Sequence, residues 1–377
     1  DASTETLEAA QTLGTNYLKL GDLVHAEPLL RECVEACPPD ALSTSESARA
    51  VYESYGELLH KQSRLEAALE IRRALVDATV AAHGPRHRDT LRSRNNLAIS
   101  LEALERFDES GEEYRKVLEL QLADPELGPD HPHTLMTRSN LSGLMRGLGR
   151  IEEARDLSAE VLATKRRVLP PGHISLVTSI NNLGELEKQL GNLAYAEELY
   201  REALEIARTN LGPSSEPTRI LTLNLARVCL EQERGDEAVQ LLEPAASASR
   251  EVAGATMLTL SIELVLCDAL LDQDRFAEAL RVADRALEEV QSPAGLQLLE
   301  PELLEVLRGE ALVGLDRGAE AETVLTAAYE QLSERDGPGS WIRRAARALA
   351  ELLDDLGEAD AAASWLERAQ EPAEDGE

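Results

Sequence analysis

The 377-residue chain carries 70 acidic and 38 basic residues, which gives it a formal net charge of −32. So large a negative charge argues against binding of nucleic acid or of an anionic membrane by the chain as a whole. Its apolar runs are shorter than a membrane span and no signal-peptide segment is present, so we expect a cytoplasmic protein. Because the chain begins at Asp1, we expect that it is processed or is an excised segment of something longer.

Ala, Leu, Glu and Arg dominate the composition, whereas only 3% of the residues are aromatic, a balance typical of an all-α protein. The four cysteines do not have the spacing of a disulfide framework, and we expect them to be reduced and to pack as small hydrophobic residues. Cys33 and Cys37 lie one helical turn apart, but a metal site would need two further ligands, which His25 alone does not supply. We therefore expect neither a metal nor a cofactor.

The segment from Leu176 to Gly212 shows the unit that the chain repeats. Apolar residues recur at helical spacing on both sides of Gly191, which predicts two amphipathic helices joined by a turn. The unit has a small residue at position 184, a second small residue twelve positions later, and the bulky Tyr200 four positions after that. Small residues let paired helices approach closely, and neither helix can bury its apolar stripe unless such units stack on one another.

The first small residue of this unit, which we call the landmark, recurs along the chain at intervals of 41 to 44 residues. The landmarks are Gly14, Gly56, Ala98, Ser142, Gly184, Ala226, Cys267, Gly309 and Ala350. The residues twelve positions later are Ala26, Ala68, Ser110, Ala154, Ala196, Ala238, Ala279, Ala321 and Ala362. Since eight of these nine residues are alanine, we predict nine helix-turn-helix repeats in an all-α fold.

The predicted repeats form a single solenoid over residues 1–377. They span about residues 3–37, 43–82, 88–122, 132–168, 173–210, 215–249, 254–291, 296–333 and 339–370, followed by an acidic tail at 371–377. Glycines that end the first helix of a repeat are expected at Gly21, Gly149, Gly191, Gly235 and Gly357.

The first repeat resembles the tetratricopeptide repeat (TPR) family. The residues that carry the resemblance, at the spacings of that family, are Leu13, Gly14, Tyr17, Ala26, Leu30, Cys33 and Pro38. The period is longer than the ~34 residues usual in that family. The surplus includes a recurring linker phrase, which reads HGPRHRDT at 83–90, LGPDHPHT at 127–134, LPPGHISL at 169–176 and LGPSSEPT at 211–218.

The linker phrases, with NNLA or NNLG on the following helix, are similar to the kinesin-light-chain type of repeat. This resemblance implies a right-handed α-solenoid in which the first helix of each repeat lines the concave face. It also implies a groove that accepts short peptides of acidic character, with aligned asparagines as contacts to the peptide backbone. Repeats of this type are common in bacterial signalling proteins, often attached to serine/threonine kinases.

Four asparagines share one repeat position in repeats three to six, immediately before the Leu-landmark pair. They are Asn96, Asn140, Asn182 and Asn224, and the residues preceding them are Asn95, Ser139, Asn181 and Leu223. A carboxamide is both donor and acceptor, so it can pair with the backbone of an extended peptide whatever its side chains. The alternative interpretation is that these asparagines cap turns or satisfy buried backbone groups between neighbouring repeats.

Positive charge is predicted on the same face. Inward positions of these repeats hold Arg92, Arg146, Lys188 and Arg227, with Arg94 and Arg138 near the rim. Against a net charge of −32, a local basic lining favours an acidic peptide ligand, because arginine–carboxylate contacts add direction and specificity. In the alternative interpretation, these cations pair with Glu102 and Glu185.

The last three repeats lack the linker phrase and have a different inward face. Its acidic residues are Asp268, Asp272, Glu310, Glu351, Asp354 and Asp355. This face is either a solvated surface over a tighter core or a second site, for a basic partner or for self-association. Trp341 and Trp365 either cap the end of the solenoid or form an exposed patch for a partner or a homodimer.

No catalytic motif is present: the sequence lacks a Gly-rich phosphate loop, a GxSxG elbow, HExxH and CxxC. Gly84 and Pro85 separate His83 from His87, so we expect no shared helix face, and His131 and His133 flank a proline in a loop. We therefore predict a non-enzymatic module or scaffold that binds an extended, acidic peptide of a partner. The alternatives are a regulatory segment of a larger bacterial signalling enzyme, a homo-oligomerising scaffold, or, less favoured by the linker phrase, a peptide-pheromone receptor.

Overall fold

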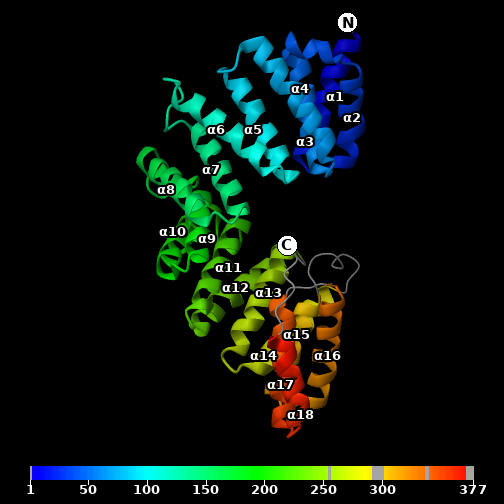
Figure 1. Cartoon of the computed structure of the whole chain (residues 1–377), viewed down its shortest axis with the longest axis vertical. Helices are drawn as coiled ribbons and strands as arrows, with labels where there is room; N and C mark the ends of the chain where they lie inside the picture. Colours follow the sequence, from blue (N-terminus) through cyan, green and yellow to red (C-terminus); the bar gives the residue numbers. More distant parts are fainter. Residues whose placement is uncertain (1, 254–255, 291–300, 336–338, 371–377) are drawn as a thin grey trace. The chain divides into compact units, whose positions relative to one another are not determined.

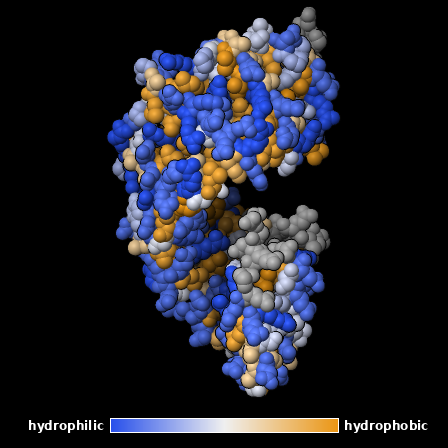
Figure 2. Space-filling model, in the orientation of Figure 1, coloured by the Kyte–Doolittle hydropathy of each residue, from blue (hydrophilic) through white to orange (hydrophobic). Residues whose placement is uncertain are grey.

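The computed structural model describes residues 2–253, 256–290, 301–335 and 339–370 (Figure 1). In these ranges all regular structure is helical, with eighteen α-helices and one 3-10 helix, which confirms the predicted all-α repeat fold. No helix in the described ranges combines the length and the apolar character needed to cross a membrane. Hydrophilic residues cover most of the face shown in Figure 2, and the hydrophobic residues on it form scattered patches.

The chain divides into two compact units, Asp1–Pro171 and Gly172–Glu377. The first unit contains α1 (Ala2–Lys19), α2 (Leu23–Glu35), the 3-10 helix η1 (Pro39–Ser43), α3 (Glu46–Lys61), α4 (Leu65–His83), α5 (Arg88–Ala103), α6 (Phe107–Leu122), α7 (Pro132–Gly147) and α8 (Ile151–Val168). The second unit contains α9 (Leu176–Gln189), α10 (Leu193–Leu211), α11 (Glu216–Glu231), α12 (Gly235–Ala253), α13 (Met257–Leu271), α14 (Phe276–Val290), α15 (Pro301–Gly314), α16 (Gly318–Glu334), α17 (Gly339–Asp355) and α18 (Ala359–Gln370). The single nine-repeat solenoid stays a prediction.

The helices pack in antiparallel pairs, and each pair contacts the next one within its unit. In the second unit the first helices of successive pairs, α9, α11, α13, α15 and α17, also contact one another. They therefore form a continuous layer, and the second helices lie behind it. Any surface that spans several repeats of this unit is built on this layer of first helices.

The landmarks are buried where paired helices approach most closely. A Cβ atom on Gly184 would lie 2.9 Å from the Tyr200 ring, and one on Gly309 would overlap Leu325. In both pairs the contact comes from the residue sixteen positions after the landmark. The residues twelve positions after the landmarks are all fully or almost fully buried. The sequence pattern therefore correctly identified buried positions where the two helices of a repeat are in close contact.

Each turn inside a repeat has one left-handed residue, seven positions after the landmark. Four of the five predicted glycines hold this position, with φ between 71° and 80°: Gly21, Gly149, Gly191 and Gly357. The prediction of Gly235 was wrong, because that residue begins α12 and Glu233 has the positive φ instead. The five remaining repeats place a non-glycine there, namely Ser63, Glu105, Glu233, Asp274 and Asp316. Since left-handed backbone costs L-residues about 1–2 kcal/mol, packing of the two helices must impose it.

The linker phrase begins the following first helix with a histidine cap. His87 precedes α5, and its Nδ1 atom accepts a hydrogen bond from the backbone N–H of Asp89 at 3.2 Å. His131 precedes α7 and accepts from the backbone N–H of His133 at 3.1 Å. These bonds satisfy N–H groups that have no partner inside the helix. His173, in a third linker phrase, accepts in the same way from the backbone N–H of Ser175 at 3.1 Å, so the histidines of the phrase have a structural role in three of the linkers.

The threonine of the phrase closes the same turn from the other side. The Thr90 hydroxyl donates to the carbonyl of Gly84 at 2.8 Å, and the Thr218 hydroxyl donates to the carbonyl of Gly212 at 2.8 Å. Both threonines are buried, and both glycines have a positive φ. The same closed turn is thus built in two of the four linker phrases, those that begin α5 and α11.

The four cysteines are free, as predicted, and Cys33, Cys229 and Cys267 are buried. The Cys267 thiol occupies a landmark position and donates to the carbonyl of Ala279 at 3.4 Å. Burial raises the pKa of the Cys229 thiol to about 11, so it stays protonated at neutral pH. These three cysteines therefore serve as small core residues.

Candidate functional site

Asn95 does not belong to an exposed groove, which corrects the sequence prediction. Only 2% of the residue is exposed, and its Nδ2 atom donates to the hydroxyl of Thr137 at 3.0 Å and to the carbonyl of Leu91 at 3.3 Å. The bond to Thr137 joins α5 to α7, the first helix of the next repeat. The alternative interpretation therefore holds for this residue: it satisfies polar groups between neighbouring repeats.

The asparagines of the second unit divide into a bonded pair and an exposed residue. Asn224 Nδ2 donates to Asn181 Oδ1 at 2.9 Å and joins α11 to α9. Asn182, the next residue on α9, is exposed. Only the outer of the two consecutive asparagines is therefore placed where a ligand can reach its carboxamide.

The corresponding residues of the first unit show the same division. Asn96 and Asn140 are half-buried, and the backbone carbonyl of Asn96 accepts a hydrogen bond from Arg72. Ser139 donates its hydroxyl to the carbonyl of Leu135 on its own helix at 2.9 Å. The carboxamides of Asn96 and Asn140 thus remain candidates for ligand contacts, whereas the Ser139 hydroxyl has an internal partner.

The predicted cations differ in how far neighbouring carboxylates compensate them. Lys188 pairs at 3.4 Å with Glu185, one of the two carboxylates that the alternative interpretation names. Arg146 is exposed, and its charge lowers the pKa of Glu102, although burial raises that pKa more strongly. Arg227 is half-buried. Arg146 is therefore the most accessible cation of the three.

Arg92 lines a cavity of about 540 Å³ in the first unit. The cavity lies between α3 and the beginning of α5, and it is lined by Glu46, Arg49, Ala50, Glu53, Thr79, His87, Arg88, Asp89 and Arg92. Arg92 crosses it to pair with Glu53 at 2.9 Å, and the Arg92 side chain is still 46% exposed. Arg49 donates to the carbonyl of Leu42 at 2.9 Å.

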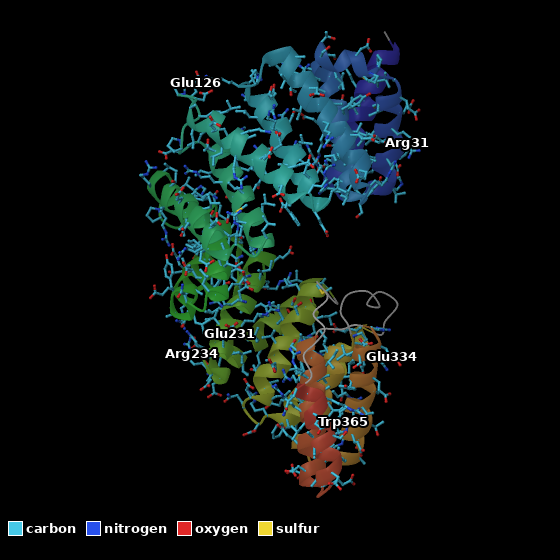
Figure 3. All side chains as sticks on the ribbon, in the orientation of Figure 1. Arg31, Glu126, Glu231, Arg234, Glu334 and Trp365 are labelled. Carbon is cyan, nitrogen blue, oxygen red and sulfur yellow. The ribbon has the colours of Figure 1, made fainter. Side chains whose placement is uncertain are left out.

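A second cavity of about 600 Å³ shares His87 and Arg88 with the first. It lies between the linker phrase at 83–90 and the α6–α7 linker, which overlaps the phrase at 127–134. It is lined by His83, Arg86, His87, Arg88, Asp124, Glu126, Leu127, His131 and His133 (Glu126 is labelled in Figure 3). Burial and the nearby charges of His131, Arg88 and Arg92 lower the pKa of His133. The two cavities together contain four arginines and four histidines against five carboxylates.

His83 and His87 share no helix face, as the intervening Gly84-Pro85 predicted, since His83 ends α4 and His87 precedes α5, but the two rings come together. Their rings stack with centroids 4.4 Å apart, and ligand atoms of His83, His87 and Asp89 lie within 4.8 Å of one another. Arg49 donates to His83 Nε2 at 3.1 Å, and Arg92 lies 3.6 Å from the Asp89 carboxylate. Because these guanidinium groups occupy the ligand atoms and repel a cation, we assign no metal to this cluster.

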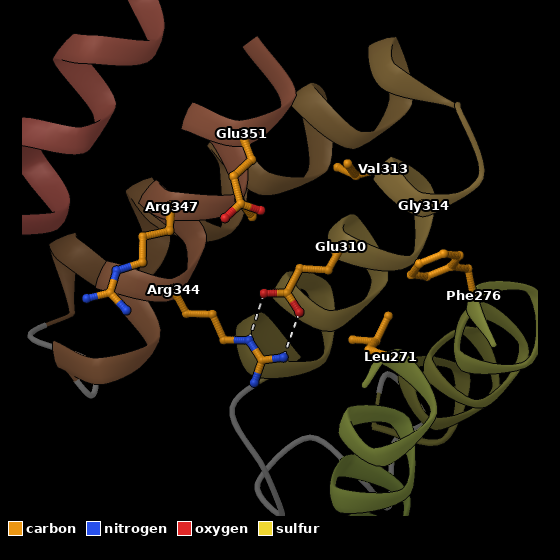
Figure 4. Close-up of a pocket in the computed structure, with 9 residues that line it drawn as sticks. Leu271, Phe276, Glu310, Val313, Gly314, Arg344, Arg347 and Glu351 are labelled. Carbon is orange, nitrogen blue, oxygen red and sulfur yellow. Dashed lines mark hydrogen bonds and ion pairs between the residues drawn. The ribbon is translucent and has the colours of Figure 1, made fainter. Parts of the chain in front are cut away.

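The second unit has a cavity of different character, with a volume of about 370 Å³ (Figure 4). It lies on the layer of first helices, and it is lined by Leu271, Phe276, Glu310, Val313, Gly314, Arg344, Arg347, Ala348 and Glu351. Gly314 is required here, because a Cβ atom would overlap the Phe276 ring. The walls are therefore largely apolar, and the polar groups come from α15 and α17.

Arg344 holds the charged floor of this cavity. Its Nε and Nη2 atoms each donate to a carboxylate oxygen of Glu310 at 2.7 Å, and Nη2 also lies 2.7 Å from Asp268. The sequence interpretation identified the carboxylates on this face and missed the arginine. The signal was available, since Arg344 stands six positions before its landmark, as Arg92 does in the third repeat.

The carboxylates around this cavity are incompletely compensated. Burial raises the pKa of Glu310 despite the bonds from Arg344, and Asp268 and Glu351 raise it further. Burial and the charge of Asp268 raise the pKa of Asp272. Among the described residues Glu351 makes no ion pair, and Figure 4 shows its carboxylate directed toward the same space as Glu310. The region therefore has an excess of negative charge.

Both tryptophans pack within their own unit. Trp341 and Trp365 are partly buried against the core formed by α15, α16 and α17. The Trp365 ring meets Tyr329 edge-on at 4.9 Å, and the Arg368 guanidinium lies 4.3 Å from the Trp365 ring centre (Figure 3). These contacts support the interpretation that the aromatic residues cap the last repeats. Homodimerisation through them stays a prediction.

Residues 127–377 match the family described as "MalT-like TPR region", and residues 47–123 match "Tetratricopeptide repeat". No curated protein matches the chain. Among solved structures, aspartyl phosphate phosphatase F from Bacillus subtilis is similar, with a TM-score of 0.59 at 10% identity over 97% of this chain and 94% of that one. A Rap protein complexed with Competence and Sporulation Factor gives 0.55 at 12% identity over 97% and 96%.

A putative kinesin light chain from Podosopora anserina is 21% identical, with a TM-score of 0.49 over 57% of this chain and 99% of that one. At these identities, the two solved structures with TM-scores above 0.5 bear on the fold alone. The family matches, in contrast, extend over most of the sequence and include both units. The resemblance inferred from the first repeat is thereby confirmed, and the chain belongs to the tetratricopeptide repeat family, with residues 127–377 forming a MalT-like TPR region.

Proposed function

We propose that this chain is a protein-interaction module that holds extended, acidic peptide segments of a partner against first helices, those of repeats three and four in the first unit and those of repeats five and six in the second. The observation that carries the proposal is the group of four arginines that lines the two adjoining cavities at the beginning of α5 and nearly balances their five carboxylates, in a chain with a net charge of −32. Guanidinium groups gathered in this way can bind carboxylates, while the acidic surface elsewhere repels most other anionic partners.

The Arg92–Glu53 pair leaves room for a ligand. An exposed ion pair of this kind is worth about 0–1 kcal/mol, so a peptide carboxylate can replace Glu53 or join it at the guanidinium. Arg88 is exposed and faces both cavities. Arginine binds carboxylates with two parallel hydrogen bonds, which would fix the direction of the peptide.

The carboxamides of Asn96, Asn140, Asn182 and Asn224 would supply the contacts that do not depend on peptide sequence. Asn182 is exposed, so its carboxamide can pair with a backbone N–H and C=O at once. Asn224 would have to exchange its bond to Asn181. Arg146 in the first unit, and Lys188 and Arg227 in the second, would each pair with a peptide carboxylate. A fold similar to that of a Rap protein complexed with a factor supports ligand binding as a role.

Fluorescence anisotropy with two labelled peptides of about 12 residues tests this function. One peptide alternates Glu or Asp with small apolar residues, and the other has Lys at every acidic position. We expect the acidic peptide to bind and the basic one not to bind at these cavities. Affinity should fall as salt rises, because exposed charges make the contacts.

The variant Arg88→Glu/Arg92→Glu should weaken the acidic peptide by at least about tenfold. The control is Arg73→Glu, which makes the same type of charge reversal at an exposed arginine on α4, outside both cavities. If Arg73→Glu weakens the affinity for the acidic peptide equally, the effect comes from the net charge of the chain alone, which would contradict the proposal. If Asn140→Ala with Asn182→Ala leaves the affinity unchanged, the carboxamide contacts are wrong.

A further inference from the structure

The cavity of the second unit combines a space for one side chain with an excess of carboxylates. The four acidic residues at or beside it are Asp268, Asp272, Glu310 and Glu351. Arg344 is bound to two of them, and Arg347 is exposed with its guanidinium turned away from Glu310 in Figure 4. With the four carboxylates and both arginines ionised, the net charge at the cavity is −2.

The apolar walls of the same cavity fit a hydrocarbon chain. Leu271 and Phe276 come from the α13–α14 hairpin, Val313 comes from α15, and Ala348 comes from α17. The absence of a side chain at Gly314 lets the Phe276 ring lie against α15 and form one wall. A ligand side chain entering here would bury methylene groups against these walls before it reached the carboxylates.

From this arrangement we infer that the cavity on α13, α15 and α17 binds a lysine or arginine side chain of a protein partner. The stem of the basic side chain lies between Phe276 and Val313, and its charged end reaches the carboxylates of Glu351 and Glu310. Long basic side chains are suited to such a site because they bury the stem and keep the charge at the polar end.

Other occupants fit the charge of the cavity less well. An acidic side chain would meet the uncompensated carboxylate of Glu351, and like charges in a partly buried site repel strongly. A purely apolar side chain would fill the space but would remove water from Glu310 without offering a hydrogen bond, which is costly for a carboxylate. A lysine or arginine side chain instead attracts the carboxylate of Glu351 and offers a hydrogen bond to Glu310. The inference does not rest on the acidic-peptide proposal, because it concerns other residues and the opposite charge.

Three blocked pentapeptides that differ only at the central residue test this site. The central residue is lysine, norleucine or glutamate, so that the first two have the same hydrocarbon length and differ in charge. Binding is followed on the full chain by the methyl signals of Leu271 and Val313 in NMR spectra. We expect the lysine peptide to bind about tenfold more tightly than the norleucine peptide, and the glutamate peptide to bind most weakly.

Two variants at the cavity and one matched control locate the binding. Glu351→Gln keeps the size of the side chain and should remove most of the preference for lysine over norleucine. Gly314→Ala pushes the Phe276 ring into the cavity and should abolish binding of both peptides. Asp355→Asn makes the same charge change at an exposed position of α17 that does not line the cavity, and it should leave the preference unchanged.

Equal affinity for lysine and norleucine would overturn the inference, as would tighter binding of glutamate or no binding of any peptide at the Leu271 and Val313 methyls. An equal loss of lysine preference in Asp355→Asn would show that net charge, and not the cavity, is responsible. Circular dichroism of each variant confirms that the helices are intact, so a loss of binding cannot come from unfolding.

Discussion

Arg92 in the first unit and Arg344 in the second occupy the same repeat position, six residues before a landmark, yet their surroundings differ. Arg92 makes largely exposed pairs with Glu53 and Asp89 in a cavity where three arginines balance three carboxylates. Arg344 is bound to Glu310 and Asp268 in a cavity with an excess of acid. The repeat position determines where a side chain lies, and the neighbouring repeats determine what that position binds.

A second pair of equivalent positions shows the same division inside the core. In the first unit the landmark Ser142 bonds to Ser158, sixteen residues later, with 2.8 Å between the hydroxyl oxygens. In the second unit the landmark Gly309 has the buried Leu325 at that position. One helix pair is thus held at its closest point by a hydrogen bond and the other by apolar packing. The following predictions measure how much each difference matters.

The largest effect is expected from Leu325→Ala. The leucine is fully buried against a glycine, so its removal leaves a cavity and should lower the free energy of unfolding by about 2–5 kcal/mol. Ser158→Ala at the equivalent position should cost about 1 kcal/mol, since one neutral hydrogen bond is lost. Urea denaturation followed by circular dichroism measures both. Similar losses would mean that the two kinds of contact are equivalent.

Arg344→Met should have the next largest effect. It leaves Glu310 and Asp268 without their cation in a site where the Glu310 side chain is only 19% exposed, and we expect a cost of about 1–3 kcal/mol. Arg92→Met should cost less than about 1 kcal/mol, because its pairs are exposed. The same denaturation measurement compares the two variants. A greater loss of unfolding free energy in Arg92→Met would contradict the claim that the more buried ion pairs of Arg344 contribute more to stability.

The cost of Arg344→Met should decrease as the pH falls. The pKa of Glu310 is raised in the folded state, so the folded chain takes up a proton more readily than the unfolded chain at pH values above the ordinary pKa of 4.5. Stability linked to this group is therefore lost as the pH rises, and a variant without Arg344 should regain about 1 kcal/mol between pH 7 and pH 5 relative to wild type. Arg92→Met serves as the control and should show a nearly constant cost.

The smallest effect concerns the turns, where the two units are alike. Glu105 in the first unit and Glu233 in the second have φ values of 59° and 58°, and replacement of either by glycine should raise the free energy of unfolding by about 0.5–1 kcal/mol. Gly149→Ala should lower it by about 1 kcal/mol. Thermal unfolding of the three variants measures the shifts. If Glu105→Gly lowers the free energy of unfolding, the Glu105 side chain stabilises the fold by more than its left-handed backbone destabilises it.

Several features of the site could be predicted from the sequence because they follow from the repeat. The equivalence of Asn96, Asn140, Asn182 and Asn224 was visible in the spacing, as was the acidic face of the last repeats. Which member of each pair of adjacent asparagines faces outward was not visible. Two consecutive residues on a helix differ by about 100° in direction, and only the position of the neighbouring helix buries Asn95 and exposes Asn182.

The histidines of the linker phrase show the converse case. In the sequence, Gly84-Pro85 argued against a shared helix face for His83 and His87, and nothing in the spacing indicated that the two rings are in contact. The folded turn, with Gly84 at a φ of 84°, brings the chain back so that the rings stack and His87 caps α5. The helical periodicity of the sequence does not predict this reversal of the chain, because the reversal depends on the conformation of the turn and not on a helix face.

The sequence by itself determined the repeat: its period, its buried small residues and its all-α class. These follow from local helix preference and from the need of each amphipathic helix to bury one stripe. The tertiary structure decided which charged residues compensate one another, as Arg344 does for Glu310 and Asp268 across three helices. Those contacts join residues 34 and 76 positions apart, and a distance in space at that separation is set by packing and not by the chain.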